Sequence, residues 1–274
     1  MRFELHCHST CSDGTERPEQ VAARAASRGV EVFALTDHDT CAGSAVTVPG
    51  ARVIRAVEIS CDEPSTGRTI HVLAYDRGGV GWSELERKLV ELREARRNRM
   101  RMMGARLAQR GIRIDVEPLI AEAETSGRTL GRPDLARLMI THGAVTSLKE
   151  AFTRHLYDGG PVDVPHHALT LPDALALGRS AFAAMSLAHP HLYDHLGVQL
   201  LKQHAHEGLR GVEAFYAVYD PRERQRWLDI AEELELVATG GSDWHGPEEA
   251  NAQPGVDIDH EHTARLEEWL FAGD

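Results

Sequence analysis

Strand-like segments alternate with helical segments in both halves of the chain, and this alternation constrains the fold more than any other feature. Residues 2–8 alternate polar and apolar side chains, residues 30–35 form a short apolar run, and a helical pattern at 18–29 lies between them. Later in the chain the expected helices are 172–182, 198–207 and 221–234, and the strands that follow them are 184–188, 211–215 and 236–239. Strands that alternate with helices in this way are typical of a parallel sheet.

The number of expected strands favours a barrel. Two further strand-like runs, 52–59 and 69–75, bring the total to seven in a chain of 274 residues. This count predicts an α/β fold in which seven strands form a distorted (β/α)7 barrel related to the eight-stranded TIM barrel. A chain of this length can bury a substantial core without disulfides or structural metals.

The alternation is interrupted in the middle of the chain. Leucines and methionines recur at helical spacing over residues 82–110, and many arginines occupy the other faces of this expected helix. Shorter helices are expected at 118–124, 134–142 and 147–157. We therefore predict a helical insertion at 80–165 and a barrel domain made of 1–79 and 166–274. The arginine run reads as a solvated face with glutamate partners.

Composition narrows the class of protein. The formal net charge is −12, so the chain lacks the excess of positive charge that general nucleic-acid binders carry. Duplex DNA is therefore not an expected partner. No apolar run is long enough to span a bilayer, and the first residues follow a strand pattern rather than a secretion signal. We expect a cytoplasmic protein with no membrane partner, and its four cysteines are expected to be reduced. No feature specifies an oligomeric state.

The chain has 16 histidines, and many of them stand with acidic residues where the expected strands end. In barrels of this type the functional side chains lie at the carboxyl ends of the strands. Applied to this sequence, the rule selects His6, His8, Asp13, Asp37, His38, Glu58, His71, His189, Asp243 and His245. Gathering so many ionisable groups at one site would be costly without cations, so the set predicts two or three divalent metal ions.

These motifs resemble those of a known family. The matching segments are His6-Cys7-His8-Ser9, Ser12-Asp13-Gly14, Thr36-Asp37-His38-Asp39, Val57-Glu58-Ile59-Ser60, His71, Ala188-His189-Pro190 and Gly241-Ser242-Asp243-Trp244-His245-Gly246. In this order they resemble the polymerase and histidinol phosphatase (PHP) family, along nearly the whole chain. Within the family the chain looks most like small bacterial enzymes that dephosphorylate 3′,5′-bisphosphate nucleotides, some of which also trim RNA from the 5′ end. Their insertion contains a Gly-Arg-Pro segment, which is present here as Gly131-Arg132-Pro133.

The resemblance implies how the metal ions would be held. His6, His8, Glu58 and Asp243 would bind the first ion, Glu58 would bridge to a second ion held by His71 and His189, and Asp13, His38 and His245 would bind the third. Some PHP proteins carry histidine where Asp13 stands. Because a carboxylate is a harder ligand, we expect Mn²⁺ first, with Fe²⁺ and Zn²⁺ as alternatives.

The resemblance also implies a reaction. We expect hydrolysis of a phosphate monoester, the 3′-phosphate of a 3′,5′-bisphosphate nucleotide, by attack of a metal-bridging hydroxide, with trimming of short RNA as a related activity. Glu58 would bridge the ions, Asp37 would orient a ligand or water, and His245 or a water would protonate the leaving oxygen. Arg132 would grip a substrate phosphate, although related sequences continue with histidine where Asp134 stands.

Two other functions share these sequence features. A histidinol-phosphate phosphatase would use the same metal chemistry with a different pocket, and a noncatalytic PHP module would dock in a larger assembly. The retained set of ligand-type residues argues against the second alternative, since loss of activity would let those positions drift. The expected partner is a small phosphorylated nucleotide or short RNA. His191 and Glu213 remain open as residues that support the ligands.

Overall fold

The computed structural model describes residues 1–157, 159–165, 169–248 and 252–271. The strands are β1 (Arg2–Glu4), β2 (Val32–Phe33), β3 (Arg52–Val53), β4 (Ala56–Asp62), β5 (Thr69–Tyr75), β6 (Leu169–Thr170), β7 (Ala184–Leu187), β8 (Leu209–Tyr216), β9 (Val237–Gly241) and β10 (Val256–Asp257). The α-helices are α1 (Pro18–Ser27), α2 (Trp82–Gln109), α3 (Glu117–Ser126), α4 (Arg132–Thr141), α5 (Leu148–Arg154), α6 (Leu171–Ser180), α7 (His195–His204), α8 (Pro221–Glu233) and α9 (His260–Phe271), and two 3-10 turns, Pro190–Tyr193 and Ala205–Glu207, flank α7.

The strands form two sheets, and the pairing is mixed. One sheet has the order β10-β1-β2-β3 and the other has the order β6-β4-β5-β7-β8-β9. The pairs β1–β2, β7–β8 and β8–β9 are parallel, as the alternation of strands and helices predicts. The pairs β4–β5 and β5–β7 are antiparallel. A purely parallel sheet is therefore wrong for this chain, because β4 and β5 follow one another through a short turn with no crossover helix.

The two sheets meet through single hydrogen bonds beyond the ends of β1 and β2. The amide of Leu5 donates to the carbonyl of Gly240 (3.2 Å), and the amide of His8 donates to the carbonyl of Trp244 (2.8 Å). On the other side, the amide of Asp39 donates to the carbonyl of Glu58 (2.9 Å). These hydrogen bonds connect the edges of the two sheets. Closure of seven strands into one barrel stays a prediction.

Several expected strands are shorter in the structure than in the sequence pattern. The run 2–8 is a strand only over Arg2–Glu4, and the run 52–59 is divided between β3 and β4, which belong to different sheets. Period-two alternation marks an extended backbone, but it does not say which partner strand each residue finds.

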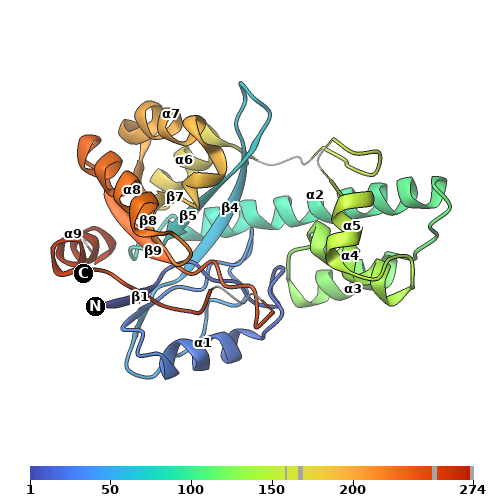
Figure 1. Cartoon of the computed structure of the whole chain (residues 1–274), viewed down its shortest axis with the longest axis horizontal. Helices are drawn as coiled ribbons and strands as arrows, with labels where there is room; N and C mark the ends of the chain where they lie inside the picture. The colour runs from blue at the N-terminus through green and yellow to red at the C-terminus, as the bar shows by residue number, and fades with distance from the viewer. Residues whose placement is uncertain (158, 166–168, 249–251, 272–274) are drawn as a thin grey trace.

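The middle of the chain forms a lobe on the long helix α2 (Figure 1). The first half of α2 packs Trp82, Leu85 and Leu89 into the main core beside the sheet. Its second half packs Met103 and Leu107 into a separate core with α3, α4 and α5. One helix thus belongs to both cores, and in Figure 1 α2 runs from the sheet to α3, α4 and α5. The boundaries of the insertion at 80 and 165 stay a prediction, and residue 166 lies outside the described residues.

Helices α6, α7 and α8 cover one face of the six-stranded sheet, while α1 lies against the smaller sheet (Figure 1). The α1 side has its own core, which includes Cys7, Phe33 and Trp244. Across the described segments, no helix combines the length and apolar character that crossing a membrane requires.

Candidate metal centre

The carboxylate of Glu58 lies at the centre of a cluster of histidines. Its Oε1 is 3.4 Å from Nε2 of His6 and 3.2 Å from both Nδ1 of His71 and Nε2 of His189. Its Oε2 is 3.2 Å from Nε2 of His8 and 2.9 Å from Nδ1 of His38. Glu58 is fully buried. The cluster thus brings together side chains from five separate segments of the chain.

His6 and His8 enter this cluster because the backbone around them is extended. Alternation sends both rings to the same side, while Cys7 between them points into the core around Trp244. Both histidines are fully buried, and their Nε2 atoms lie 3.3 and 3.1 Å from Oδ1 of Asp243. Gly241 makes this approach possible, since a Cβ there would lie 2.5 Å from the backbone nitrogen of His6.

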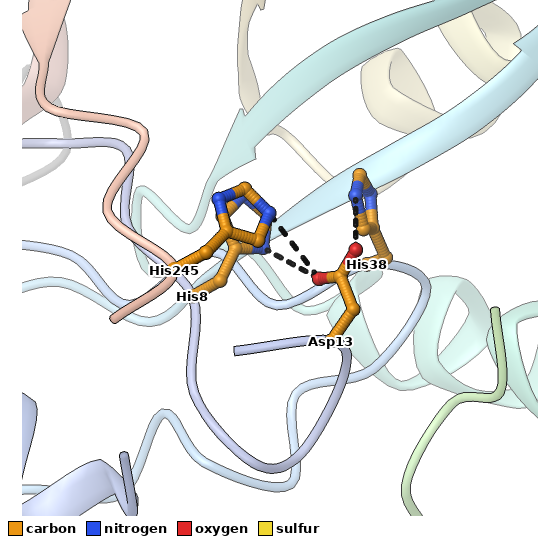
Figure 2. A group of neighbouring side chains, drawn as sticks. All are labelled: His8, Asp13, His38 and His245. Atoms are coloured by element: carbon orange, nitrogen blue, oxygen red, sulfur yellow. Dashed lines mark ion pairs between the residues drawn. The ribbon is translucent and has the colours of Figure 1, made fainter. Parts of the chain in front are cut away.

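A second group lies toward the open side of the cluster (Figure 2). The carboxylate of Asp13 points between three rings: it is 3.3 Å from Nε2 of His245, 3.8 Å from Nε2 of His38 and 3.9 Å from Nδ1 of His8. The rings of His8 and His245 stack with centroids 4.1 Å apart. Asp13 and His245 are 15% and 22% exposed, so this group borders solvent.

His71 joins the cluster because β5 is antiparallel. It stands third in its strand and pairs with Ser60, two residues after Glu58. The next strand, β7, brings His189 beside it, with Nε2 of His189 3.2 Å from Nδ1 of His71. His189 has a φ of 28° and Asp243 has a φ of 52°. Such values are strained for residues other than glycine and are found where a site constrains the backbone.

Several buried atoms of this cluster lack hydrogen bonds. Within the described residues, Nε2 of His6, Nε2 of His8, Asp13 Oδ1, His38 Nδ1 and Glu58 Oε2 are buried without a hydrogen-bond partner. Buried polar atoms normally make hydrogen bonds, so a group of nitrogen and oxygen atoms that lie close together without hydrogen bonds fits bound cations. The donor set of imidazoles and carboxylates suits divalent transition metals.

Three groups of ligand atoms could each hold an ion, with all atoms of a group within 4.8 Å of one another. They are His6–His8–Glu58, His38–Glu58–His71 and His8–Asp13–His38–His245. Asp243 and His189 border the first two groups at the distances given above. The family resemblance implies a division of the ligands in which His8 and His38 each bind one ion. In the structure each of these two histidines belongs to two groups. The assignment of each ligand to an ion stays a prediction.

The electrostatics of the cluster also favour positive charge. Burial would lower the pKa of His6, but Glu213, Asp243 and Glu58 raise it well above its ordinary value. Burial would raise the pKa of Glu58, but His38, His6 and His71 hold it well below its usual range. The anionic side chains around His6 therefore stabilise either a proton or a metal ion on its ring.

The ligand-type residues are held by a second set of side chains. Both carboxylate oxygens of Glu213 lie near Nδ1 of His6, at 3.0 and 3.1 Å, and Oε2 also accepts the amide of His189 (2.7 Å). A histidine that donates Nδ1–H to a carboxylate presents Nε2 as a free lone pair, which is the form that binds metal. The hydroxyl of Tyr216 donates to Oδ2 of Asp243 (2.8 Å), which leaves Oδ1 facing the histidines.

Asp37 does not join the cluster. Its Oδ1 accepts the amide of Ser9 (2.8 Å) and the hydroxyl of Ser12 (2.6 Å), and its Oδ2 accepts the hydroxyl of Ser9 (2.7 Å). These bonds hold the turn that leads to Asp13. The carboxylate of Asp37 thus contacts serines rather than the histidine cluster, and its expected role in orienting a ligand or water stays a prediction.

Arg132 lines the same cavity as the metal cluster. This cavity has a volume of about 1010 Å³, and its lining includes Asp13, His38, His71 and His189 of the candidate metal centre together with Arg132 at the start of α4. The guanidinium of Arg132 donates to the carbonyl of Leu156 (3.2 Å). Asp134, where related sequences carry histidine, accepts the amide of Gly131 (2.8 Å) and a bond from Arg128 (3.0 Å).

Sequence reasoning missed the role of Tyr216 and left Glu213 and His191 open. Glu213 alternates with apolar residues on a buried strand, and an acidic residue at such a position is a usable signal. His191 lies farther out, where Nδ1 meets the hydroxyl of Tyr219 (2.9 Å). Nothing in the sequence shows that Tyr216 reaches Asp243, because that contact joins the last residue of β8 to the segment after β9.

Known proteins resemble the chain over most of its length. A phosphoribosyl 1,2-cyclic phosphate 1,2-diphosphodiesterase from Eggerthella lenta is 31% identical over 254 residues, which cover 90% of this chain and 95% of that protein. A 3′,5′-nucleoside bisphosphate phosphatase from Chromobacterium violaceum is 31% identical over 269 residues, covering 94% and 90%. A 5′-3′ exoribonuclease from Haemophilus influenzae is 30% identical over 260 residues, covering 90% of each chain.

The fold is shared as well. A crystal structure of a Bifidobacterium adolescentis protein described as a metal-dependent phosphoesterase matches with a TM-score of 0.82 at 26% identity, covering 97% of this chain and 96% of that one. The sequence pattern of the PHP domain matches residues 4–98, which contain His6, His8, Asp13, His38, Glu58 and His71. On its relatives, its fold and its motifs, the chain belongs to the PHP domain family.

Proposed function

We propose that this chain hydrolyses the 3′-phosphate of 3′,5′-bisphosphate nucleotides. Membership of the PHP family makes it a metal-dependent phosphoric ester hydrolase. The finer statement concerns the substrate, and one observation supports it most: a single cavity is lined by the candidate metal ligands on one wall and by arginines of the insertion on another.

A substrate with two phosphate groups fits these two walls. One phosphate would lie at the metal cluster, and the other would meet Arg132 or its neighbour Arg99, which also lines the cavity. A guanidinium presents a planar fork of N–H donors that matches phosphate oxygens. The guanidinium carbon of Arg132 lies 5.9 Å from the centroid of the Phe152 ring, and this contact helps to fix the position of the side chain in the cavity wall.

Bound divalent ions would neutralise the phosphoryl oxygens and lower the pKa of water toward neutrality. The chain supplies the ligands proposed above, and Glu213 and Tyr216 orient two of them. His245 is 22% exposed at the open side, where we propose that the leaving oxygen is protonated by a water, or by Nε2 of His245 when that nitrogen holds no ion. Mn²⁺ is the proposed metal, with Fe²⁺ and Zn²⁺ as the alternatives to be compared.

The names of the relatives support recognition of two phosphates. A nucleoside 3′,5′-bisphosphate and a phosphoribosyl 1,2-cyclic phosphate each carry two phosphate groups on one sugar. An exoribonuclease substrate also carries phosphates on successive sugars. A small monophosphate such as histidinol phosphate would leave the arginine wall without a partner.

The proposal is tested by measuring hydrolysis of a substrate series at a fixed enzyme concentration with added Mn²⁺, with released inorganic phosphate and released nucleotides both quantified. The substrates are 3′,5′-bisphosphate nucleotides, the matching 5′-monophosphates, a phosphoribosyl 1,2-cyclic phosphate, histidinol phosphate and short 5′-phosphorylated RNA. We expect the highest kcat/KM with a bisphosphate nucleotide. Higher kcat/KM with histidinol phosphate or the cyclic phosphate would reassign the substrate, and no hydrolysis of any substrate by metal-loaded protein would favour a noncatalytic module.

A further inference from the structure

Three arginines spaced three residues apart on α2 turn toward the protein rather than solvent. Arg93 donates to the carbonyl of Asp39 (3.0 Å), and Arg99 donates to the carbonyl of Val164 (2.7 Å). Arg96 lies between them and is 10% exposed. The sequence pattern assigned this helix a solvated arginine face, which fits Arg87 with its glutamate neighbours but does not fit these three residues.

Arg96 contacts three separate segments with one guanidinium. Its Nε donates to Oδ2 of Asp39 (2.7 Å), and one Nη donates to the hydroxyl of Ser60 (2.7 Å). The other Nη donates to the carbonyl of Leu130 (3.2 Å). A planar fork can meet three acceptors in three directions, which a lysine ammonium on a flexible stem does not reproduce.

Each of these acceptors stands beside a residue of the proposed site. Asp39 follows His38, Ser60 is two residues after Glu58 on β4, and Leu130 is two residues before Arg132. Arg96 therefore joins two candidate metal ligands to the segment that carries the proposed phosphate contact. Because α2 spans both cores, the connection also ties the insertion to the sheet.

Asp39 is the residue through which this contact reaches the metal cluster. Its Oδ1 accepts the amide of Ser60 (2.8 Å), and its own amide donates to the carbonyl of Glu58 (2.9 Å). Asp39 is fully buried and has a φ of 51°. A buried carboxylate on a left-handed backbone persists only where its surroundings hold it, and Arg96 supplies the opposite charge.

We propose that Arg96 is a positioning residue for the metal centre: through Asp39 and Ser60 it holds His38 and Glu58 in the geometry that binds metal. The proposal concerns metal retention and needs no particular substrate, so it stands or falls separately from the proposed phosphatase activity. Loss of outer partners of metal ligands costs about 10- to 100-fold in metal affinity.

The test measures Mn²⁺ binding without substrate. Metal-free protein is titrated with MnCl2, and free Mn²⁺ is followed by its EPR signal. We expect Arg96→Met to weaken binding by about 10- to 100-fold and Arg96→Lys to weaken it by at least about threefold, because lysine restores the charge beside Asp39 but not the fork. The melting temperature of each variant is recorded in the same buffer.

Two controls separate positioning from general damage. Arg101→Met alters an arginine of the same helix that is 45% exposed and pairs with Glu117, so Mn²⁺ affinity should stay within twofold of the unmodified chain. Leu107→Ala weakens the core of the insertion, so it should lower the melting temperature without changing Mn²⁺ affinity.

Folded Arg96→Met protein that binds Mn²⁺ within twofold of the unmodified chain would overturn the proposal. If Arg96→Met does not fold, the same criterion applies to Arg96→Lys: Mn²⁺ binding within twofold of the unmodified chain would overturn the proposal. Equal weakening by Leu107→Ala at a matched loss of melting temperature would also overturn it, since the effect would then follow stability alone.

Discussion

Both carboxylate oxygens of Glu58 face histidine nitrogens, whereas Asp13 stands at the solvent side of the cluster. We therefore expect Glu58→Ala to reduce kcat/KM for nitrophenyl phosphate at saturating Mn²⁺ at least about tenfold more than Asp13→Ala. The physical reason is that Glu58 is the proposed bridge between two ions, so its loss would disturb both. Glu84→Ala, on the exposed face of α2, is the control and should leave the rate unchanged. Equal residual rates for the first two variants would contradict the bridging assignment.

Arg132 is the residue that should discriminate between substrates. Arg132→Ala should lower kcat/KM for a 3′,5′-bisphosphate nucleotide by about ten- to a hundredfold, which is the value of a charge-assisted contact of roughly 1.5–3 kcal/mol. The rate with nitrophenyl phosphate should change little, because that substrate has no second phosphate. Arg132→Lys should restore part of the loss, and metal content should stay constant in both variants.

A loss of the same size with both substrates, or no loss with either, would remove Arg132 from the phosphate site. Its contact with the carbonyl of Leu156 would then serve as a link between α4 and the segment after α5. Steady-state kinetics with the two substrates, measured on the same protein preparation, distinguish these outcomes.

At the scale of elements, the close approach of β9 to the segment after β1 decides where His6 lies. Gly241→Ala would place a Cβ 2.5 Å from the backbone nitrogen of His6, so the two segments must separate. We expect a loss of about 1–3 kcal/mol in the free energy of unfolding, from urea denaturation, together with a lower metal content by elemental analysis.

Gly104→Ala is the matched control for this variant. The nearest atoms that a Cβ at Gly104 would meet are side-chain atoms of Val116, the closest at 3.1 Å, within the core of the insertion. Overpacking there should change stability without loss of metal. Full metal content in folded Gly241→Ala protein would show that the approach of β9 does not position His6.

The elements that the sequence predicts well are those with a local cause. Pro18 at the first turn and the turn at Gly29 bracket α1, and the alternation around Cys7 correctly sends His6 and His8 to one side. The convergence of strand ends on one site also followed from the sequence, because parallel strands bring their carboxyl ends to the same edge.

Features that depend on partners distant in the chain could not be predicted in this way. The antiparallel pairing of β4 with β5 places His71 near the start of its strand, against the strand-end rule. Asp37 lies beside His38 in the sequence, yet its carboxylate turns to Ser9 and Ser12. The inward turn of Arg96 depends on where Asp39 lies, which helical periodicity does not encode.

At the scale of the whole molecule, the metal cluster joins segments from both ends of the chain and from its middle. We expect two to three transition-metal ions per chain by elemental analysis of protein prepared without chelator. Removing them with a chelator should lower the melting temperature, because ligands that bind only the folded state stabilise it, by about 4 kcal/mol when free metal is a thousandfold above the Kd. Fully active protein that contains no metal would refute the proposed chemistry.

The stabilisation by metal should depend on pH in a direction set by the histidines. Burial would lower the pKa of both His6 and His8. The carboxylate of Glu213 raises the pKa of His6, and those of Asp243 and Glu58 raise the pKa of His8, so that both values lie above the ordinary one. In the metal-free chain these protonated histidines therefore add stability that is present below their ordinary pKa and is lost as the pH rises through the raised value. Metal must displace these protons, so its own contribution grows as the pH rises. We expect the increase in melting temperature on adding Mn²⁺ to be larger at pH 8.5 than at pH 6. The same increase at both pH values would mean that ligands other than His6 and His8 hold the ions.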